Sequence, residues 1–467
     1  MPAASSLTRF AVVGLLGVAA LAKLPTLAQP LTENFAWRQT QTAWTARIYH
    51  QQGIDLLHPQ VPVHGPPWQF AFEFPLFQAL GAVLMDLGLE PDIAMRSLGL
   101  MTFLVSGWLM YALLTRLAGS AAGLAALAAF LFSPFGLLWG RTSLIEYLAT
   151  AGALAFLLGA VRWLERGQPS DFAVALVAGV LAMLVKITTG AFYLVPLLAY
   201  RRSGRPLLIS EWSVPILVGV PSLAGLVWTR YADALKAATP ATEFQTSANM
   251  VGFNFGSPDM RVDPDVLLPI ASALLIGLTG AGLLIWLPAA IAKMRQLEQG
   301  PLLATVLLST LVGAPLVLTP LYSTQNYYPA AISPAAAILV GLGGSWGWAH
   351  RRALLGRFVL IAGTLLWIVS LVMTGTYWLV SYAPVVDRDG SLAAAAFVRE
   401  RTDPGDWVVI GGRNYDPTIL YYAERRGYML DPRRGTDDLA ALRADPRYTL
   451  FVDCPYQANC TVMPEQP

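Results

Sequence analysis

Charged residues are scarce in this chain, and their scarcity excludes an ordinary soluble protein. Asp, Glu, Lys and Arg together make up 13% of the 467 residues, whereas hydrophobic residues make up 55%. The mean hydropathy is +0.53. A soluble globular domain contains about 25% charged residues. The composition therefore indicates a chain that places most of its length in a lipid bilayer.

Cysteine and histidine are also scarce, which limits the redox and metal chemistry of the chain. The two cysteines, Cys454 and Cys460, both lie near the C-terminus, far in sequence from the four histidines. A zinc site built from both residue types is therefore not expected. Two cysteines that close a short loop in an oxidising compartment favour a disulfide, the alternative being two unpaired thiols.

Long apolar runs dominate what remains. A helix that spans a bilayer needs about 20 mostly apolar residues, and eleven runs reach or approach this length. The runs cover residues 8–27, 96–115, 120–138, 143–163, 171–187, 188–200, 212–230, 266–291, 301–319, 328–346 and 356–379. The shortest, 188–200, predicts a short or broken helix. We expect an α-helical polytopic membrane protein with about eleven transmembrane helices.

The distribution of basic residues predicts the orientation of these helices. Alternate connections between the runs carry clusters of Lys and Arg, such as those at 201–205 and 351–357. Such loops face the cytoplasm, so we expect a multi-pass plasma-membrane protein with a cytoplasmic N-terminus and a periplasmic or extracellular C-terminus. The alternation requires run 8–27 to be retained as a helix. No basic patch indicates a nucleic-acid partner.

The chain changes character after Tyr382. The pattern predicts helices at Leu392–Arg401 and Pro417–Arg426, and strands at 406–412 and 448–452. We therefore divide the chain into a transmembrane domain, 1–382, which includes an outer loop at 28–95, and an outer α/β module, 383–467. The glycines after the first of these strands do not form the G-x-G-x-x-G pattern of a dinucleotide site.

The outer loop is rich in both polar and aromatic residues. A helix over 37–51 would place Trp37, Gln41, Trp44 and Ile48 on one stripe, with Arg38 nearby. This pattern suits a helix at the membrane interface. Its simplest interpretation is structural.

Glu73 stands between two phenylalanines, just before an amphipathic stretch at 76–88. A carboxylate among aromatic residues at the membrane face is costly unless it has a partner or a function. The functional interpretation is a general base or an anchor for a bound cation. The structural interpretation is a salt bridge to Arg38 or Arg47.

Three further motifs contain polar residues at the ends of apolar runs or in the outer loop. They are Trp37-Arg-Gln-Thr-Gln-Thr-Ala43 with Glu73-Phe-Pro-Leu76, Leu184-Val-Lys-Ile-Thr-Thr-Gly190, and Gln325-Asn-Tyr-Tyr-Pro329 with Pro334. Together they resemble the GT-C class of membrane glycosyltransferases, in particular the family 39 group of protein O-mannosyltransferases and bacterial aminoarabinose transferases. The resemblance implies transfer of a sugar from a polyprenyl-phosphate donor to a lipid, glycan or protein acceptor at the outer face. Membrane lipids would surround the enzyme. No cofactor is certain, although a divalent metal stays open, and no metal-binding residues are predicted.

The resemblance and the topology together select the candidate site residues. Glu73 is the candidate catalytic residue. The candidate substrate-binding residues are Arg38, Gln41, Arg141, Lys186, Asn326 and Tyr327. Arg141 and Lys186 are expected at outer helix ends, where a cation would stabilise the departing lipid phosphate, the alternative being snorkelling to the interface. Glu146 is a candidate partner for Arg141.

One departure from the family pattern concerns the catalytic acid. Family members carry an Asp early in the first outer loop, but the matching stretch, Arg38–Gln41, contains no acid. The site would then use Glu73 alone, recruit Glu33 or Asp55, or be impaired. Two alternatives therefore stay open beside the enzyme: a transporter or flippase of an amphiphilic substrate, and a catalytically impaired relative that binds a lipid-linked sugar.

Overall fold

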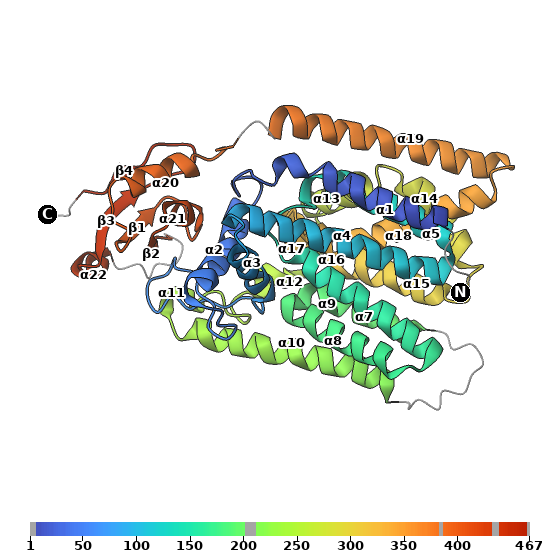
Figure 1. Cartoon of the computed structure of the whole chain (residues 1–467), viewed down its shortest axis with the longest axis horizontal. Helices are drawn as coiled ribbons and strands as arrows, with labels where there is room; N and C mark the ends of the chain where they lie inside the picture. Colours follow the sequence, from blue (N-terminus) through green and yellow to red (C-terminus); the bar gives the residue numbers. More distant parts are fainter. Residues whose placement is uncertain (1–5, 201–211, 383–385, 432–438, 465–467) are drawn as a thin grey trace.

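The computed structural model describes residues 6–200, 212–382, 386–431 and 439–464. A bundle of helices forms most of the molecule, and a small α/β module lies at one end of it (Figure 1). The N-terminal end of α1 and the turn between α18 and α19 lie at the opposite end of the bundle. The molecule is therefore polarised along the helix axes, as a protein with one domain outside the membrane requires.

Each of the eleven apolar runs is helical. In chain order the runs correspond to α1 (Ser6–Leu21), α4 (Pro91–Ala118), α5 (Ser120–Leu131) with α6 (Pro134–Trp139), α7 (Glu146–Arg166), α8 (Pro169–Val185), α9 (Ile187–Leu194), α10 (Ser213–Ala237), α13 (Pro264–Ser272) with α14 (Leu283–Met294), α15 (Gly300–Leu307) with α16 (Ala314–Val317), α18 (Ser333–Ala349) and α19 (Leu354–Tyr377). The run at 188–200 is short and ends in a 3-10 turn, Val195–Ala199, as predicted.

The number of full-length spans is smaller than the number of runs. Within the described residues, six helices are long and apolar enough to cross a membrane, or seven if a bent pair counts as one span. Others are shorter, such as α5 with 12 residues. The estimate of about eleven transmembrane helices thus holds for apolar helical segments, but not for helices of full spanning length.

Run 266–291 is the clearest departure from a straight span. Its two halves, α13 and α14, are bent by 72°. Gly280 and Ala281 at the break have φ of 59° and 58°, a conformation that is costly for residues with a side chain. A Cβ at Gly280 would lie 2.5 Å from the Trp367 ring. Glycine at this position therefore allows both the turn and the close approach of α19.

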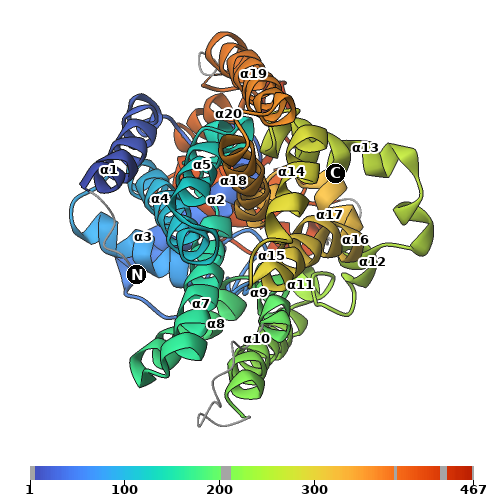
Figure 2. The ribbon, with the colours of Figure 1, turned by 90° about the vertical axis from the view of Figure 1, so that its right-hand side faces the viewer.

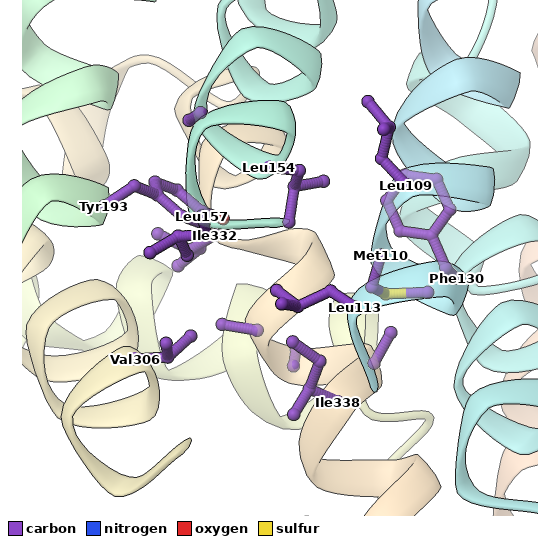
Figure 3. Packing of buried hydrophobic residues seen from close by; sticks show 14 of the residues in the cluster. Leu109, Met110, Leu113, Phe130, Leu154, Leu157, Tyr193, Val306, Ile332 and Ile338 are labelled. Atoms are coloured by element: carbon purple, nitrogen blue, oxygen red, sulfur yellow. The ribbon is translucent and has the colours of Figure 1, made fainter. Parts of the chain in front are cut away.

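Small, aliphatic and aromatic residues form the centre of the bundle. Leu113 on α4, Phe130 on α5, Leu157 on α7 and Ile338 on α18 are almost completely buried and point into one cluster (Figure 3). Small residues let membrane helices approach closely. By contrast α1 and α19 lie at the periphery (Figure 2), with only 17% of their apolar windows buried. Their exposed apolar faces suit contact with lipid.

The outer loop folds into α2 (Ala36–Gln52) and α3 (Leu76–Asp86), which confirms the predicted helix over 37–51. Most of α2 is buried rather than spread along the membrane surface. Trp44 is 5% exposed and contacts Tyr421 of the module. Shorter helices complete this end of the bundle: α11 (Pro240–Glu243), α12 (Val251–Phe255) and α17 (Thr319–Thr324).

The C-terminal module contains a four-stranded sheet in the order β2-β1-β3-β4. The strands are β1 (Trp407–Gly411), β2 (Arg426–Met429), β3 (Tyr448–Asp453) and β4 (Thr461–Val462), and the helices are α20 (Ser391–Arg399), α21 (Thr418–Ala423) and α22 (Leu439–Ala444). The strands β2, β1 and β3 are parallel. The predicted helix Pro417–Arg426 is shorter than expected, because β2 begins at Arg426. Cys454 and Cys460 form a disulfide beside β3 and β4.

Hydrogen bonds fix the module to the outer loop and to the start of α4. Tyr421 and Tyr422 both donate to the Asp92 carboxylate, at 2.6 and 2.8 Å. The backbone N–H of Met429 donates to Val63 O at 2.9 Å. Apolar residues of both parts share one buried cluster. The module is therefore held in a defined position over this end of the bundle.

Candidate functional site

A cavity of about 480 Å³, here called the main cavity, lies where the helix bundle meets the module. Its lining includes residues from α2 and the loop before α3 (Trp37, Arg38, Phe72, Glu73), the break between α8 and α9 (Lys186–Thr188), α10 (Thr229, Ala232, Asp233, Lys236), the start of the α18 run (Tyr327, Tyr328) and the module (Arg413–Asp416, Tyr456). Segments far apart in sequence thus converge on one polar and aromatic space.

Arg38 and Glu73 form an ion pair on the cavity wall. Arg38 Nη2 lies 2.6 and 2.7 Å from the two Glu73 carboxylate oxygens, and Arg38 Nη1 donates to Gln41 Oε1 at 2.6 Å. The salt bridge that the structural interpretation required is therefore present, with Arg38 as the partner. Arg47 pairs with Glu424 of the module instead. The pair still faces the cavity, so it can act on a bound substrate.

The charges around Glu73 determine its ionisation. Burial alone would raise its pKa, but the charges of Arg38 and Lys186 and the hydrogen bonds from Arg38 outweigh burial and lower the pKa. Glu73 is therefore a carboxylate at neutral pH. Its negative charge is available at the cavity without any further proton release.

Lys186 stands where α8 ends and α9 begins. Its extended backbone, with φ −160° and ψ 96°, interrupts the helical run and turns the side chain toward the cavity. The Lys186 ammonium group pairs with Glu146, the first residue of α7, and lies 4.1 Å from the Tyr328 ring centroid. Glu146 is thus the partner of Lys186 rather than of Arg141.

A second pair on the cavity wall was not foreseen. Lys236 Nζ lies 3.0 Å from Asp233 Oδ1, both near the end of α10. Ionisable residues in membrane helices mark functional sites. Two of them three positions apart at the end of an apolar helix could therefore have indicated this pair from the sequence. Both residues lie just beyond the apolar run at 212–230, which did not single them out.

Three of the candidate binding residues lie outside the main cavity lining. Arg141 is 1% exposed and donates from Nη2 to Glu33 Oε2 at 2.7 Å. Gln41 lies behind Arg38, and Asn326 is exposed to solvent. The structure therefore gathers Arg38, Glu73, Lys186 and Tyr327 at one place, and separates Arg141 from them.

The two replacement acids considered for the outer loop are also outside the main cavity lining. Glu33 is held by Arg96, at 2.5 Å, and by Arg141. Asp55 is exposed and pairs with His58 at 2.9 Å. Both carboxylates have structural partners that account for them.

The module contributes the remaining wall through the loop that follows β1. Loops at the carboxyl ends of parallel strands commonly carry sites in α/β folds. The position of this loop directly after the predicted strand 406–412 was therefore a sequence signal for a site. Arg413 donates from Nε to Cys454 O at 2.7 Å and from Nη1 to Ser391 Oγ at 2.7 Å. Tyr415 packs edge-on against Trp37, with ring centroids 5.8 Å apart. In the part of the chain that the structure describes, no group of three or more His, Cys, Asp or Glu could hold a metal ion.

The comparisons with known proteins agree with this architecture. Residues 71–228 match the family model of dolichyl-phosphate-mannose-protein mannosyltransferases. ArnT from Cupriavidus metallidurans, solved with bound undecaprenyl phosphate, is similar with a TM-score of 0.65 and 15% identity, over 94% of this chain and 89% of that chain. The chain has the GT-C fold.

Two further GT-C structures are similar over most of this chain. The oligosaccharyltransferase AglB from Archaeoglobus fulgidus, solved with an inhibitory peptide and a dolichol-phosphate, has a TM-score of 0.53 and 13% identity, over 91% of this chain and 65% of that chain. The mycobacterial arabinofuranosyltransferase AftD has a TM-score of 0.51 and 16% identity, over 91% and 33%. No curated protein matches the chain in sequence. The GT-C comparison thus rests on three-dimensional structure and on the family model.

Proposed function

We propose that this GT-C protein transfers a sugar from a polyprenyl-phosphate donor to a hydroxyl-bearing acceptor at the outer face of the membrane. The observation that carries the proposal is the main cavity, which places Arg38, Glu73 and Lys186 between the membrane helices and the module. A lipid-linked donor needs such a junction, because its tail belongs in the bilayer and its sugar in water.

The proposed donor site is the membrane side of the cavity. Lys186 and Arg38 would stabilise the phosphate as it leaves, since fixed cations favour developing negative charge in a site with little water. Tyr327 lies beside them, and Gln41 orients Arg38. The similar structures were solved with undecaprenyl phosphate and with dolichol-phosphate, which supports a polyprenyl-phosphate donor here.

The proposed reaction breaks the bond between the anomeric carbon and the phosphate oxygen. The acceptor oxygen forms the new bond to that carbon, the electron pair leaves on the lipid phosphate, and the acceptor proton passes to a carboxylate. Glu73 is our candidate for that carboxylate, because it is ionised and lies on the cavity wall. Its low pKa makes it a modest base, so pairing with Arg38 must loosen as the phosphate draws Arg38 away.

The substitution Glu73→Gln tests this role. It keeps the size of the side chain and one hydrogen-bond acceptor but removes the charge, so we expect transfer to fall by about 100-fold or more, while the protein still accumulates in the membrane. The measurement is label transfer from tritiated undecaprenyl-phosphate sugars, hexoses and pentoses, by the purified full chain.

Glu165→Gln is the matched control. Glu165 also pairs with an arginine, Arg116, and has a similar side-chain exposure of 30% against 24% for Glu73, but it does not line the cavity. Normal transfer by Glu73→Gln would remove Glu73 from the chemistry. Donor binding by the wild-type chain without bond cleavage would support the impaired relative, and donor translocation without cleavage would support the transporter.

The proposed orientation has its own test. Single cysteines at Asp403 on the module and at Arg352 between α18 and α19 should differ in intact cells. Asp403→Cys should react with an impermeant maleimide from outside, whereas Arg352→Cys should react only after permeabilisation. The opposite pattern would place the main cavity on the cytoplasmic side and overturn transfer at the outer face.

A further inference from the structure

A second cavity, of about 320 Å³, is lined by the stretch that leads into α2 and by residues of the module. We call it the outer cavity. It is lined by Thr32–Trp37, Arg388, Asp389, Asp416 and Tyr456. Three of these residues, Trp37, Asp416 and Tyr456, also line the main cavity. They therefore form a shared wall between two spaces, only one of which reaches the donor-binding cations.

Asp416 differs from the other two carboxylates of the main cavity in its partners. Glu73 pairs with Arg38, and Asp233 pairs with Lys236. Asp416 Oδ1 accepts from the Thr418 backbone N–H at 2.9 Å and from its hydroxyl at 2.5 Å, and Oδ2 accepts from Tyr456 OH at 2.9 Å. Within the described residues Asp416 has no ion pair, although it is only 6% exposed.

This environment is costly for a carboxylate. Burial raises the pKa of Asp416, and the hydrogen bonds from Thr418 and Tyr456 lower it only in part. A cap on the short helix α21 explains the Oδ1 contacts, but it would work equally well with a serine or an asparagine. The cap therefore does not explain why an ionisable group stands at the wall between two cavities.

Asp416 Oδ2 retains capacity for another donor. A carboxylate oxygen has two lone pairs, and Tyr456 uses one of those on Oδ2. The rings of Trp37 and Tyr415 meet edge-on next to it, which gives a bound molecule an apolar surface beside a hydrogen-bond acceptor. Such a combination orients small polar ligands.

We propose that Asp416, carried by the module, accepts a hydrogen bond at the shared wall from an acceptor hydroxyl other than the attacking one, so that an acceptor entering through the outer cavity is oriented toward the donor in the main cavity. The inference rests on the proposed function and adds a residue that selects and orients the acceptor. It also gives the module a role in acceptor binding, in a chain whose Arg38–Gln41 stretch lacks the acid that family members carry there.

Asp416→Asn tests the inference without removing the cap. The asparagine carbonyl still accepts from Thr418, whereas an NH2 group takes the place of Oδ2 and donates instead of accepting, so the hydrogen bond from the acceptor hydroxyl is lost. Hydrogen bonds to charged groups are stronger than neutral ones by an amount equal to about tenfold in binding. We expect the acceptor KM to rise by about tenfold or more, while the donor KM stays within about twofold.

The assay uses the full chain in detergent with tritiated undecaprenyl-phosphate sugars as donors, and with octyl glucoside, octyl galactoside and a Ser/Thr-rich octapeptide as acceptors. The probe that the wild-type chain labels best is then titrated against each variant. Asp403→Asn is the matched control, because Asp403 is an exposed carboxylate of the same module that lines neither cavity. Tyr456→Phe, which removes the hydrogen bond to Oδ2, should shift the acceptor KM by a smaller amount, and this shift should not add to that of Asp416→Asn because both act through Oδ2.

The outcomes separate the two proposals. If the wild-type chain transfers sugar and Asp416→Asn leaves the acceptor KM unchanged, the inference falls and the proposed function stands. If Asp416→Asn raises donor and acceptor KM equally, its role is structural and the inference falls as well. If the wild-type chain cleaves none of the donors, the proposed function falls, and the inference with it.

Discussion

Charged side chains on the two walls of the main cavity have different kinds of partner. On the membrane side, Lys186 pairs with Glu146, and Arg38 pairs with Glu73. On the module side, Arg413 is held mainly by backbone carbonyls and a serine, and Asp416 by hydroxyls and an amide. The membrane side thus neutralises each charge with a close opposite charge. On the module side Arg413 has one longer ion pair, 3.6 Å to Asp389, beside its neutral partners, and Asp416 is surrounded by neutral dipoles alone.

The difference follows from the two environments. An unpaired charge among membrane helices is not hydrated, and its burial costs several kcal/mol. The module lies outside the apolar segments, where local dipoles can support a carboxylate. In the proposed function the membrane side therefore has the fixed task, phosphate binding, and the module side is freer to vary with the acceptor.

Removal of one partner on the membrane side should give the largest effect on stability. Lys186→Ala leaves Glu146, which is 1% exposed, without its cation, and breaking a buried pair costs about 3–5 kcal/mol. We expect a clear fall in melting temperature by differential scanning fluorimetry, together with loss of donor binding.

The double variant Lys186→Ala/Glu146→Ala separates these two effects. Replacing both partners should recover most of the stability but none of the donor binding, since the phosphate cation is still missing. Lys293→Ala on α14, outside the cavity lining, is the control. A double variant as unstable as the single one would show that the pair is not the source of the stability.

The disulfide should give a smaller effect, confined to the module. The bond between Cys454 and Cys460 closes a short loop with a sequence separation of 6, so the entropic stabilisation is about 2 kcal/mol. Because Cys454 O accepts from Arg413, the double variant Cys454→Ala/Cys460→Ala should also raise the acceptor KM slightly. Mass spectrometry without reductant that finds both thiols free in extracted protein would contradict the disulfide.

The sequence predicted the elements better than their assembly. The apolar runs located the long helices of the bundle, since bilayer solvation imposes a strong local pattern, but they did not locate the short helices α11, α12 and α17. Local pattern did not reveal the break at Gly280, which depends on the approach of Trp367 from another helix. It likewise did not show that 12-residue α5 would be too short to span alone.

The candidate site shows the same division. The Arg38–Glu73 pair was foreseen as an alternative, because both residues lie in one loop with few other partners. The partner of Arg141 was not, because Glu33 is brought to it by tertiary packing across 108 positions of sequence. For the module wall the loop after β1 was a general signal, but nothing near Asp416 in sequence indicates that Trp37 lies beside it.

The smallest predicted effect is the pH dependence that distinguishes Asp416 from Glu73. The pKa of Asp416 is raised above its ordinary value of 3.8, so the folded chain binds this proton more tightly than the unfolded chain does. The free energy of unfolding should therefore fall as the pH rises from 3.8 through the folded pKa, and then stay level. The pKa of Glu73 is lowered from 4.5, so its contribution is present above that pH and is lost as the pH falls through the folded pKa.

Asp416→Asn and Glu73→Gln should consequently change opposite ends of a plot of the free energy of unfolding against pH, measured between about pH 3 and pH 8. Asp416→Asn should remove the loss that accompanies rising pH, because the amide carries no charge to bury. Glu73→Gln should remove the loss that accompanies acidification, and should lower stability near neutrality because Arg38 is left unpaired. Identical profiles for the two variants would mean that both walls stabilise charge in the same way, which would remove the basis for assigning them to different substrates.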